Sequence, residues 1–513
     1  MSFPHPWPAL EKAAELWPDA VALVFPHQNE RRSFLQWRND ALALTGQLAA
    51  HGLRRGDHVA LLAENRVEWP IVQMACASLG ALFIPLNTHY RRDDLAFALK
   101  QSRARAIFCS ARYRSNPFLE TIAALRPELP DLDHVFCLDG EDAILGEAHP
   151  PSFAGSGDDI GALLYTSGTT GFPKGALLSH RAMMMVAAGT AGRLGLAAGD
   201  RWTSIIPLFH CAGCIMNILG CLQHGAAYVG VPSFDAETMF KNIEAERCTH
   251  LSGVPTSYLA MLDHPARASY DLRTLRAGSC GGADCDPALL RRCAEEFPMP
   301  GLAQVYGQTE GATIFTAPRH DDPRRWETAG TALPGYEIRI VEPQTLHPLD
   351  AGEIGEIQAR GPMVMAGYHD RPRETAEVLL ADGWLRTGDL GYLDHDGHLV
   401  IAGGRLRDMI IRGGENIYPA EIENVLCRHG MVKAAAVFAE SDRYYGEIVA
   451  AAVRLGGAAT AADIMAHCAA RIAHFKVPAR LYAVEAFPLT PSGKVRKVEL
   501  RRLAAEGKLA ALP

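Results

Sequence analysis

The sequence is poor in charge and in cysteine, and its start lacks the pattern of an export signal. Charged residues make up 21% of the 513 residues and apolar residues 48%, a balance that excludes an intrinsically disordered chain. The 50 Lys and Arg are outnumbered by 58 Asp and Glu, and the net charge of −8 argues against non-specific nucleic-acid binding. Residues 1–20 contain prolines and acids but no apolar stretch of a secretory leader. We therefore expect a cytoplasmic protein whose 12 cysteines are reduced thiols.

Charge is absent altogether from residues 202–234, a run long enough to span a membrane. Prolines, histidines and glycines interrupt this run, so we interpret it as a strand at Ile205 and Ile206, a helix at 214–223 and a strand at 227–231. Continuous apolar strands suit a parallel sheet covered on both faces, and we expect no transmembrane segment. A zinc site is the alternative use of the run, because it contains Cys211, Cys214, Cys221 and His224. Cysteines in one apolar run more often pack as small hydrophobic residues, which we favour.

Helical and strand patterns alternate through the first half of the chain, which predicts doubly wound α/β layers. After Glu337, short strands separated by turns predict an antiparallel or barrel-like β-rich subdomain. A compact α+β unit of about a hundred residues follows Gly403 and Gly404. We expect an α/β fold with an N-terminal domain at 1–403, a small mobile C-terminal domain at 404–513 and a hinge at about 404–408. The expected helices are 33–51, 67–79, 91–101, 421–429 and 461–473, and the expected strands are 58–63, 81–86, 106–109, 161–164, 249–251, 337–341, 355–360, 397–401, 432–438 and 448–454.

The strongest local signal is the segment YTSGTTGFPKG, from Tyr165 to Gly175. It follows an apolar strand and precedes a helical pattern that begins near His180. Backbone N–H groups and hydroxyls in such a loop can surround a polyphosphate, and Lys174 adds positive charge. Its spacing does not match the Walker A pattern. The alternative is an ordinary Gly/Ser/Thr surface turn, which the density of donors after a strand makes less favoured.

The segment resembles the phosphate-binding signature of the acyl-adenylate-forming (AMP-binding) superfamily. Five further motifs resemble that family and follow in its order: YGQTE at 306–310, WLRTGD at 384–389, GRLRD at 404–408, GGENIYP at 413–419 and PLTPSGK at 488–494. The resemblance covers nearly the whole chain. It is greatest to acyl-CoA synthetases of medium-chain or broad specificity.

This resemblance implies where ATP and Mg²⁺ bind. The β- and γ-phosphates are expected at Thr166, Ser167, Gly168, Thr169, Thr170, Gly171 and Lys174. Adenine is expected beside Gly281, Gly282, Ala283, Tyr306 and Gly307. Thr309 can hydrogen-bond a phosphate, and Glu310 supplies an oxygen ligand suited to Mg²⁺. Asp389 is expected to accept both ribose hydroxyls, with assistance from Arg405.

The family carries out two half-reactions, and the resemblance assigns residues to both. A carboxylic acid and MgATP give an acyl-adenylate and pyrophosphate, with Lys494 neutralising charge on the carboxylate and α-phosphate. The small domain then rotates and presents Gly413 and Gly414 beside a pantetheine tunnel, and coenzyme A takes the acyl group with release of AMP. The hinge position two residues after Arg405 carries Arg407, followed by Asp408, where the family usually has Asp or Lys. Basic residues that could meet CoA phosphates are Arg412, Arg471 and Lys476, although a solvated basic face explains them equally well.

The acid substrate is expected to be fatty, alicyclic or otherwise apolar. Amino-acid-activating relatives place an Asp in an F-D motif, and this sequence has His210 after Phe209 instead, which would leave a buried ammonium group without its partner. Candidates for the acyl pocket or its gate are His210, Val254, Tyr258 and Gly311. We expect a carboxylic acid–CoA ligase of fatty acid metabolism that acts on small molecules, and a homodimer is compatible with the resemblance.

Three alternatives have different biochemistry. A stand-alone adenylating enzyme would load an acyl carrier protein instead of CoA. A luciferase-like oxidative enzyme is suggested only by fold-level analogy. A non-catalytic binding protein is disfavoured because Lys174, Glu310, Asp389 and Lys494 are all present.

Overall fold

The computed structural model describes residues 3–140, 150–166, 173–282, 285–405, 410–417, 419–488, 495 and 497–513, with the backbone alone described at 402–405, 416, 420 and 498. The chain divides into two compact units. The first unit comprises Met1–Thr88, Leu99–Tyr165 and Gly175–Gly404. The second comprises His89–Ala98, Thr166–Lys174 and Arg405–Pro513, so it takes in two short early segments that the sequence did not indicate. Part of the predicted hinge, Arg407 and Asp408, lies outside the described residues.

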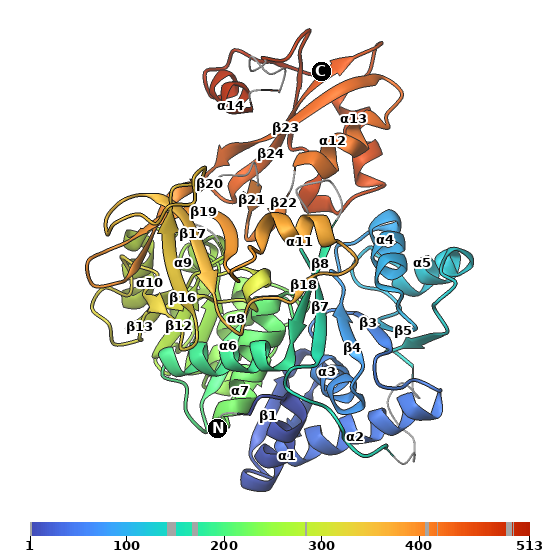
Figure 1. Cartoon of the computed structure of the whole chain (residues 1–513), viewed down its shortest axis with the longest axis vertical. Helices are drawn as coiled ribbons and strands as arrows, with labels where there is room; N and C mark the ends of the chain where they lie inside the picture. The colour runs from blue at the N-terminus through green and yellow to red at the C-terminus, as the bar shows by residue number, and fades with distance from the viewer. Residues whose placement is uncertain are drawn as a thin grey trace. The chain divides into compact units, whose positions relative to one another are not determined.

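A mainly parallel sheet of seven strands forms one half of the first unit (Figure 1). We call it the first sheet. Its order is β18-β8-β7-β4-β3-β5-β6, with bounds Gly367–Tyr368, Lys174–Ser179, Ile160–Thr166, Leu82–Pro85, His58–Leu62, Ala106–Cys109 and His134–Cys137. The pair β18 and β8 is antiparallel, whereas β3 is parallel to both β4 and β5. The connecting helices are α3 at Glu68–Leu79, α4 at Arg92–Ser102, α5 at Phe118–Leu125 and the short 3-10 helix η2 at Arg126–Glu128.

A second seven-stranded sheet forms the other half of the first unit, and we call it the second sheet. Its order is β13-β12-β11-β9-β10-β1-β2, with bounds Gly301–Gln304, Ala277–Cys280, His250–Gly253, Arg201–Ser204, Ala227–Val229, Val21–Phe25 and Glu30–Ser33. All its neighbours are parallel except β1 and β2. Its helices are α8 at Ala236–Glu246, α9 at Pro255–Leu262 and α10 at Pro287–Glu296, with 3-10 turns η1 at Pro26–Gln28, η4 at Pro265–Ser269 and η5 at Thr309–Gly311.

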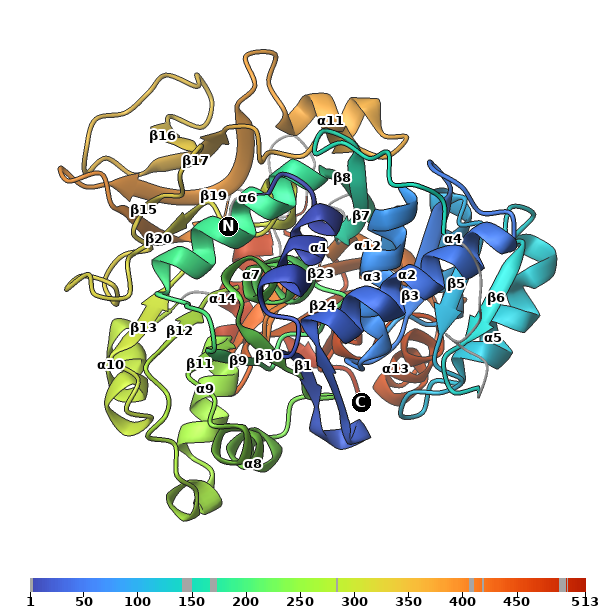
Figure 2. The same cartoon turned by 90° about the horizontal axis from the view of Figure 1, so that it is seen from below.

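Helices packed against one another form the main core of this unit (Figure 2). They are α1 at Pro6–Leu16, α2 at Phe34–Ala50, α3, α6 at His180–Arg193, the π-helical segment η3 at Ala212–Leu219 and α7 at Gly220–His224. Trp7, Trp37, Trp69 and Trp202 are fully buried in it. The uncharged run 202–234 is therefore a strand–helix–strand passage of the core, as predicted. Its first strand is wrong, however, because β9 ends at Ser204 and so excludes Ile205 and Ile206.

Each helix in the described ranges is either too short or too polar to cross a lipid bilayer. The longest, α2, has 17 residues.

The β-rich subdomain predicted after Glu337 is a four-stranded antiparallel sheet of order β16-β17-β19-β20. Its strands are Glu337–Val341, Gly355–Arg360, Leu385–Leu393 and Leu399–Arg405, and the first two match the expected bounds. Short elements beside it are β14 at Thr316–Ala317, β15 at Thr331–Ala332 and helix α11 at Pro372–Val378.

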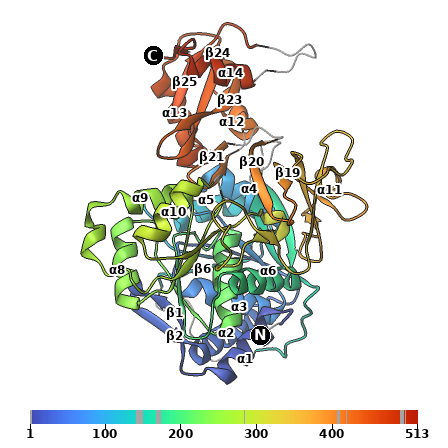
Figure 3. The same ribbon diagram turned by 90° about the vertical axis from the view of Figure 1, so that its left-hand side faces the viewer.

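The C-terminal part of the second unit is an α+β sandwich around one six-stranded sheet (Figure 3). Its strands are β21 at Ile410–Arg412, β22 at Glu415–Ile417, β23 at Val432–Asp442, β24 at Gly446–Leu455, β25 at Arg480–Ala483 and β26 at Ala510–Ala511. Side chains on β23 alternate between two cores, since Val437 packs in one and Phe438 in the other. The first core includes residues of α12 (Pro419–Cys427) and α13 (Ala461–Ala469), and the second includes α14 (Lys497–Ala505); a 3-10 turn η6 lies at His474–Lys476.

Candidate functional site

The carboxyl ends of four neighbouring parallel strands in the second sheet bring several of the predicted site residues to one edge. In the strand register, Ser204 of β9 pairs with Ser252 of β11. Gly253 of β11 pairs with Cys280 of β12, and Cys280 pairs with Gln304 of β13. His210 follows β9, Val254 follows β11, Gly281 and Gly282 follow β12, and Tyr306 follows β13. Ligands of open α/β sheets bind at this edge.

Two distant motifs meet through one hydrogen bond. The hydroxyl of Tyr306 donates to Asp389 Oδ2 at 3.0 Å. Asp389 is held in β19 by Thr387, whose Oγ1 accepts the Asp389 N–H at 3.1 Å and donates to the carbonyl of Ile357 at 2.6 Å. Gly388 between them has φ of +74°, a conformation that favours glycine. The T-G-D sequence is therefore an irregular part of strand β19, where the register with β17 shifts, and it holds one carboxylate at the Tyr306 hydroxyl.

Glu310 is a buried carboxylate, with 8% of its surface exposed. Its Oε1 accepts the hydroxyl hydrogen of Tyr368 at 2.7 Å, and its carbonyl accepts the N–H of Met365 at 2.7 Å. In the part of the chain that the structure describes, Glu310 has no salt bridge. Burial of a charged carboxylate raises the free energy of the folded state unless a cation offsets the charge. The Glu310 carboxylate is therefore suited as an oxygen ligand of a divalent cation such as Mg²⁺.

Glycines let the backbone around Glu310 pack very closely. A Cβ at Gly307 would lie 2.1 Å from the carbonyl oxygen of Thr313, and a Cβ at Gly311 would lie 1.9 Å from the Phe315 ring. The turn continues through Thr313, whose φ of +114° is rare for a side chain of that shape. These positions hold Thr309 and Glu310 in a strained turn, a feature that often marks functional sites.

Thr309 contacts Cys211, which we interpreted from the sequence only as a zinc ligand or as a packed hydrophobic residue. The Sγ of Cys211 lies 3.4 Å from Thr309 Oγ1 and 3.7 Å from His210 Nδ1. Burial alone would raise the pKa of the Cys211 thiol, but His210 and the hydroxyls of Thr309 and Thr313 outweigh it and lower that pKa. No group of three or more metal-ligating side chains occurs within the described ranges.

The His210 segment is clamped by Asn65. The N–H of Leu208 donates to Asn65 Oδ1 at 2.7 Å, and the N–H of Ala212 donates to His210 Nδ1 at 3.2 Å. Since Nδ1 accepts, the hydrogen-bond pattern assigns the ring proton to Nε2. His210 is half-buried and lies two residues before the π-helical segment.

The other pocket candidates behave differently. Val254 is half-buried, and its side chain would be 3.6 Å from a Cβ at Gly282. Tyr258 is fully buried in a core beside the second sheet, and its hydroxyl contacts the carbonyls of Leu251 at 2.9 Å and Ser279 at 3.1 Å. The structure gives Tyr258 a packing role, and its contact with a substrate stays a prediction.

Only the ends of the predicted phosphate loop are described. Thr166 ends β7, Lys174 begins β8, and Thr166 Oγ1 donates to the Lys174 carbonyl at 3.3 Å. The Lys174 side chain is buried. The strand that begins at Lys174 was not predicted, because Lys174 and Gly175 were expected in the loop and residues 176–179 were assigned to no element. Seven predicted residues lie outside the described residues: Ser167, Gly168, Thr169, Thr170, Gly171, Ala283 and Lys494. Arg405 ends β20, and its side chain is not described.

Gly413 and Gly414 form the two-residue turn between β21 and β22. Their φ angles are +57° and +87°, as in the hairpin turn for which glycine pairs are favoured. The N–H of Gly413 donates to the Tyr445 carbonyl at 2.9 Å, and the Arg412 guanidinium lies 4.6 Å from the centre of the Tyr445 ring. An exposed aromatic ring with a cation suits a nucleotide.

Lys476 agrees with neither use suggested by the sequence, a contact with CoA phosphates or a solvated basic face, because it is buried. Its side chain is 3% exposed and forms an ion pair with Glu421, and Asp94 Oδ1 lies 3.8 Å from its Nζ. Burial alone would lower the pKa of Lys476, but these carboxylates raise it. Lys476 is thus a buried counter-ion, and Arg412 is the better-placed cation.

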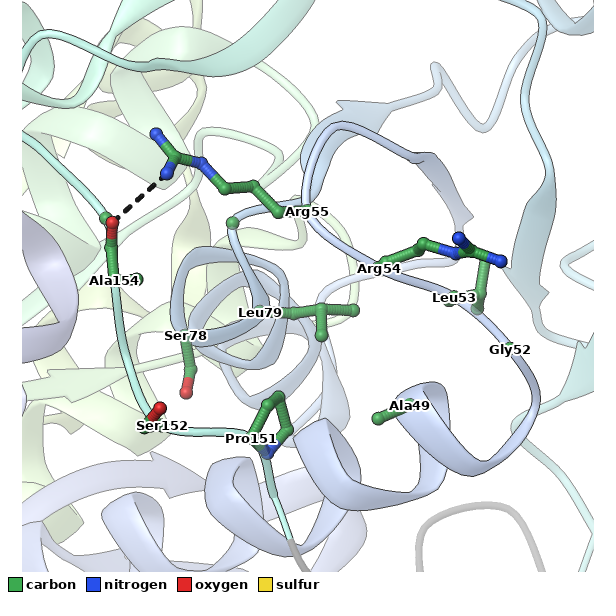
Figure 4. A pocket seen from close by; sticks show the side chains of 12 residues that line it. Ala49, Gly52, Leu53, Arg54, Arg55, Ser78, Leu79, Pro151, Ser152 and Ala154 are labelled. Atoms are coloured by element: carbon green, nitrogen blue, oxygen red, sulfur yellow. Dashed lines mark hydrogen bonds between the residues drawn. The ribbon is translucent and has the colours of Figure 1, made fainter.

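A surface pocket of about 480 Å³ occupies another part of the first unit (Figure 4). None of the predicted site residues that the structure describes line it. Arg55 at its rim donates to the Ala154 carbonyl at 3.2 Å and forms a salt bridge with Asp159 at 2.7 Å. These contacts give Arg55 a structural role.

Comparisons with known proteins agree with this geometry. A family model described as AMP-binding enzyme matches residues 10–369, and one described as AMP-binding enzyme C-terminal domain matches residues 421–494. The protein YngI of Bacillus subtilis is 37% identical over 97% of this chain and 96% of its own length. The medium-chain acyl-CoA ligase ACSF2 of Danio rerio, a mitochondrial protein, is 33% identical over 96% of this chain and 87% of its own. A solved structure of o-succinylbenzoate CoA synthetase from Bacillus subtilis, bound with a product analogue, superposes with a TM-score of 0.87 at 28% identity, covering 99% of both chains.

Proposed function

Because this chain belongs to the AMP-binding enzyme family and is a carboxylic acid–CoA ligase, we propose that it activates a fatty, alicyclic or other apolar acid. The acid and MgATP give an acyl-adenylate and pyrophosphate, and the CoA thiol then displaces AMP to give the acyl-CoA. The observation that carries this proposal is the joining of the Tyr306 and Asp389 motifs by a 3.0 Å hydrogen bond at the carboxyl edge of the second sheet.

ATP fits the polar end of this edge. The Tyr306 ring offers a flat face for adenine, and Asp389 would accept the ribose hydroxyls. Thr309 and Glu310 follow in the same turn, where Glu310 would hold Mg²⁺. The bound ion would supply positive charge for the pyrophosphate leaving group. Lys174 and residues 166–171 would bind the β- and γ-phosphates.

The acid would lie beside His210, Val254 and Gly311. These residues offer small or apolar surface, and no carboxylate among the described residues of the His210 segment 205–212 would hold a substrate ammonium. The names of the relatives give a medium-chain acid and o-succinylbenzoate as substrates, and neither is an α-amino acid. We therefore propose an apolar acid over an amino acid.

CoA is the proposed acceptor. Gly413 and Gly414 keep the turn free of side chains where pantetheine would pass. Arg412, stacked on the Tyr445 ring, would meet the nucleotide end of CoA. Lys494 would act earlier, by stabilising the charge that develops as the acid attacks the α-phosphate.

A screen of pyrophosphate release over carboxylic acids tests the substrate. We expect release with medium-chain and alicyclic acids, and thioester formation with CoA but not with an acyl carrier protein. Preference for α-amino acids would refute the apolar-acid proposal, and preference for the carrier protein would refute CoA as acceptor.

Replacement of Lys494 tests the division into half-reactions. In Lys494→Ala we expect acyl-adenylate formation to be lost while thioester formation from supplied acyl-adenylate continues. Lys508→Ala is the matched control, since Lys508 is an exposed lysine of the same C-terminal segment with 61% of its side chain accessible. Equal retention of both half-reactions in Lys494→Ala would show that the lysine has been assigned wrongly.

A further inference from the structure

Two cysteine sulfurs touch at the carboxyl end of β12. Cys280 is the last residue of that strand, and Cys285 lies two residues before α10. Their Sγ atoms are 3.5 Å apart. Cys280 is completely buried, whereas Cys285 is half-buried. The pair therefore combines one thiol that solvent can reach with one that it cannot.

A third cysteine packs nearby but is shielded. Cys293 on α10 is completely buried, and burial raises the pKa of its thiol to about 12. Burial also raises the pKa of Cys280 well above its usual range. Both therefore remain protonated near neutral pH and react slowly with oxidants. An oxidant from solvent would meet Cys285 first.

We propose that Cys280 and Cys285 are an oxidisable pair that closes into a disulfide and switches off acid activation. A peroxide oxidises the Cys285 thiol to a sulfenic acid and is itself reduced to water. The Cys280 sulfur then attacks the Cys285 sulfur. The S–S bond forms, the S–O bond breaks, and the hydroxide leaves with the Cys280 proton as a second water. Both sulfurs need to approach by about 1.5 Å in total to reach bonding distance.

The disulfide would affect activity because the two cysteines flank closely packed backbone at the strand ends. Residues 281–282 lie between the ends of two neighbouring strands, because a Cβ at Gly281 would be 2.7 Å from the Val305 carbonyl oxygen and one at Gly282 would be 3.6 Å from Val254. Val305 is followed directly by Tyr306. A cross-link that ties residue 280 to residue 285 displaces backbone packed this tightly. The loss of activity rests on the proposed function, in which this backbone borders adenine, whereas formation of the disulfide does not.

Peptide mapping after peroxide treatment of the full-length protein tests the disulfide. Trypsin releases both cysteines in one peptide, residues 277–291, and Cys293 in another. After hydrogen peroxide and alkylation of remaining thiols, we expect peptide 277–291 to lose two hydrogens and to carry no alkyl group. Dithiothreitol should restore two alkylation sites. A peptide that stays fully alkylated, or a disulfide that joins Cys293 instead, would overturn the proposal.

Adenylation assays on the same samples test the switch. We expect loss of most pyrophosphate release on oxidation, recovery with dithiothreitol, and resistance in Cys285→Ser and Cys280→Ser. Cys427→Ser is the matched control, because Cys427 is exposed yet distant in sequence, and this variant should stay sensitive. A disulfide that leaves the rate unchanged would overturn the switch. If the unoxidised protein activated no acid, the proposed function would fail while the mass measurement still decided the disulfide.

Discussion

The two seven-stranded sheets of the first unit have similar topologies but opposite chemistry at their carboxyl ends. In the first sheet the residues after β3, β5 and β6 form a closed polar network around Arg66, whose side chain is 8% exposed. Arg66 donates to Glu68 at 2.8 Å, to Asp139 at 2.6 Å and to the Leu138 carbonyl at 3.0 Å. In the second sheet the corresponding ends carry glycines, hydroxyls, aromatic rings and the carboxylate of Glu310, which has no salt bridge among the described residues.

This difference distinguishes the strand ends that stabilise the fold from the strand ends that bind ligands. A buried charge whose partners are all supplied by the protein holds elements together and has no capacity left for a substrate. A buried carboxylate without a protein cation, next to glycines that keep the backbone close, is prepared for a cation from outside. The same parallel topology therefore supports either role, and the side chains after the strands decide between them.

Removal of the Arg66 guanidinium should give the largest effect on folding. Arg66→Met leaves Glu68 and Asp139 without their cation, and we expect the free energy of unfolding to fall by about 3 kcal/mol. Burial alone would raise the pKa of Glu68, but Arg66 outweighs it and lowers that pKa. The stabilisation from this pair is thus present above the usual pKa of 4.5 and is lost as the pH falls through the lowered value. In Arg66→Met the free energy of unfolding should therefore not show this decrease at acidic pH. Urea denaturation at several pH values measures both effects.

Arg103→Met is the matched control for this prediction. Arg103 pairs with Asp370 at 3.0 Å, but the two side chains are 66% and 54% exposed, so the change should be below about 1 kcal/mol. Neither variant should alter the rate of the folded enzyme. Equal destabilisation by both substitutions would break the distinction between the closed network and an ordinary surface pair.

Neutralisation of Glu310 should slow the reaction but leave stability nearly unchanged, which is the opposite of the effect expected for Arg66→Met. Glu310→Gln can still accept the Tyr368 hydroxyl hydrogen but loses the charge that would hold Mg²⁺. We expect adenylation to slow about a hundredfold, with a raised Mg²⁺ requirement and little change in unfolding free energy. Pyrophosphate release at increasing Mg²⁺ measures this, with Glu377→Gln on the exposed face of α11 as the control. A normal rate and Mg²⁺ dependence in Glu310→Gln would contradict the metal assignment.

Local patterns predicted 11 of the 26 strands among the described residues, namely β3, β4, β5, β7, β10, β11, β16, β17, β20, β23 and β24. The bounds of β5, β16 and β17 agree with expectation because short alternating or apolar runs between turns mark a strand locally. The missed strands include β1, β2, β6, β8, β12 and β13, and β9 was misplaced beyond Ser204, because pairing with neighbouring strands decides their limits more than the local pattern does. The π-helical form of 212–219 also has no local signal that we can identify.

For the site, the motifs indicated Tyr306, Glu310 and Asp389, and the resemblance supplied their roles. It did not indicate Tyr368, which lies on a two-residue strand and contacts Glu310 only through tertiary packing. Nor did it reveal the contact of Cys211 with Thr309. Such partners come from elements that are far apart in the sequence, and no local spacing records their contact.

The smallest predicted effect tests the hydrogen bond that joins the two nucleotide motifs. Tyr306→Phe keeps the ring and removes only the donor to Asp389, so we expect a cost of about 1 kcal/mol, seen as a roughly fivefold higher KM for ATP with little change in kcat. Tyr270→Phe is the matched control, because Tyr270 donates to Glu237 at the same 3.0 Å distance outside the strand ends. Initial rates at varied ATP distinguish them. If both variants raised the KM alike, the Tyr306 bond would be one more structural contact, and the second sheet's edge would resemble the Arg66 network after all.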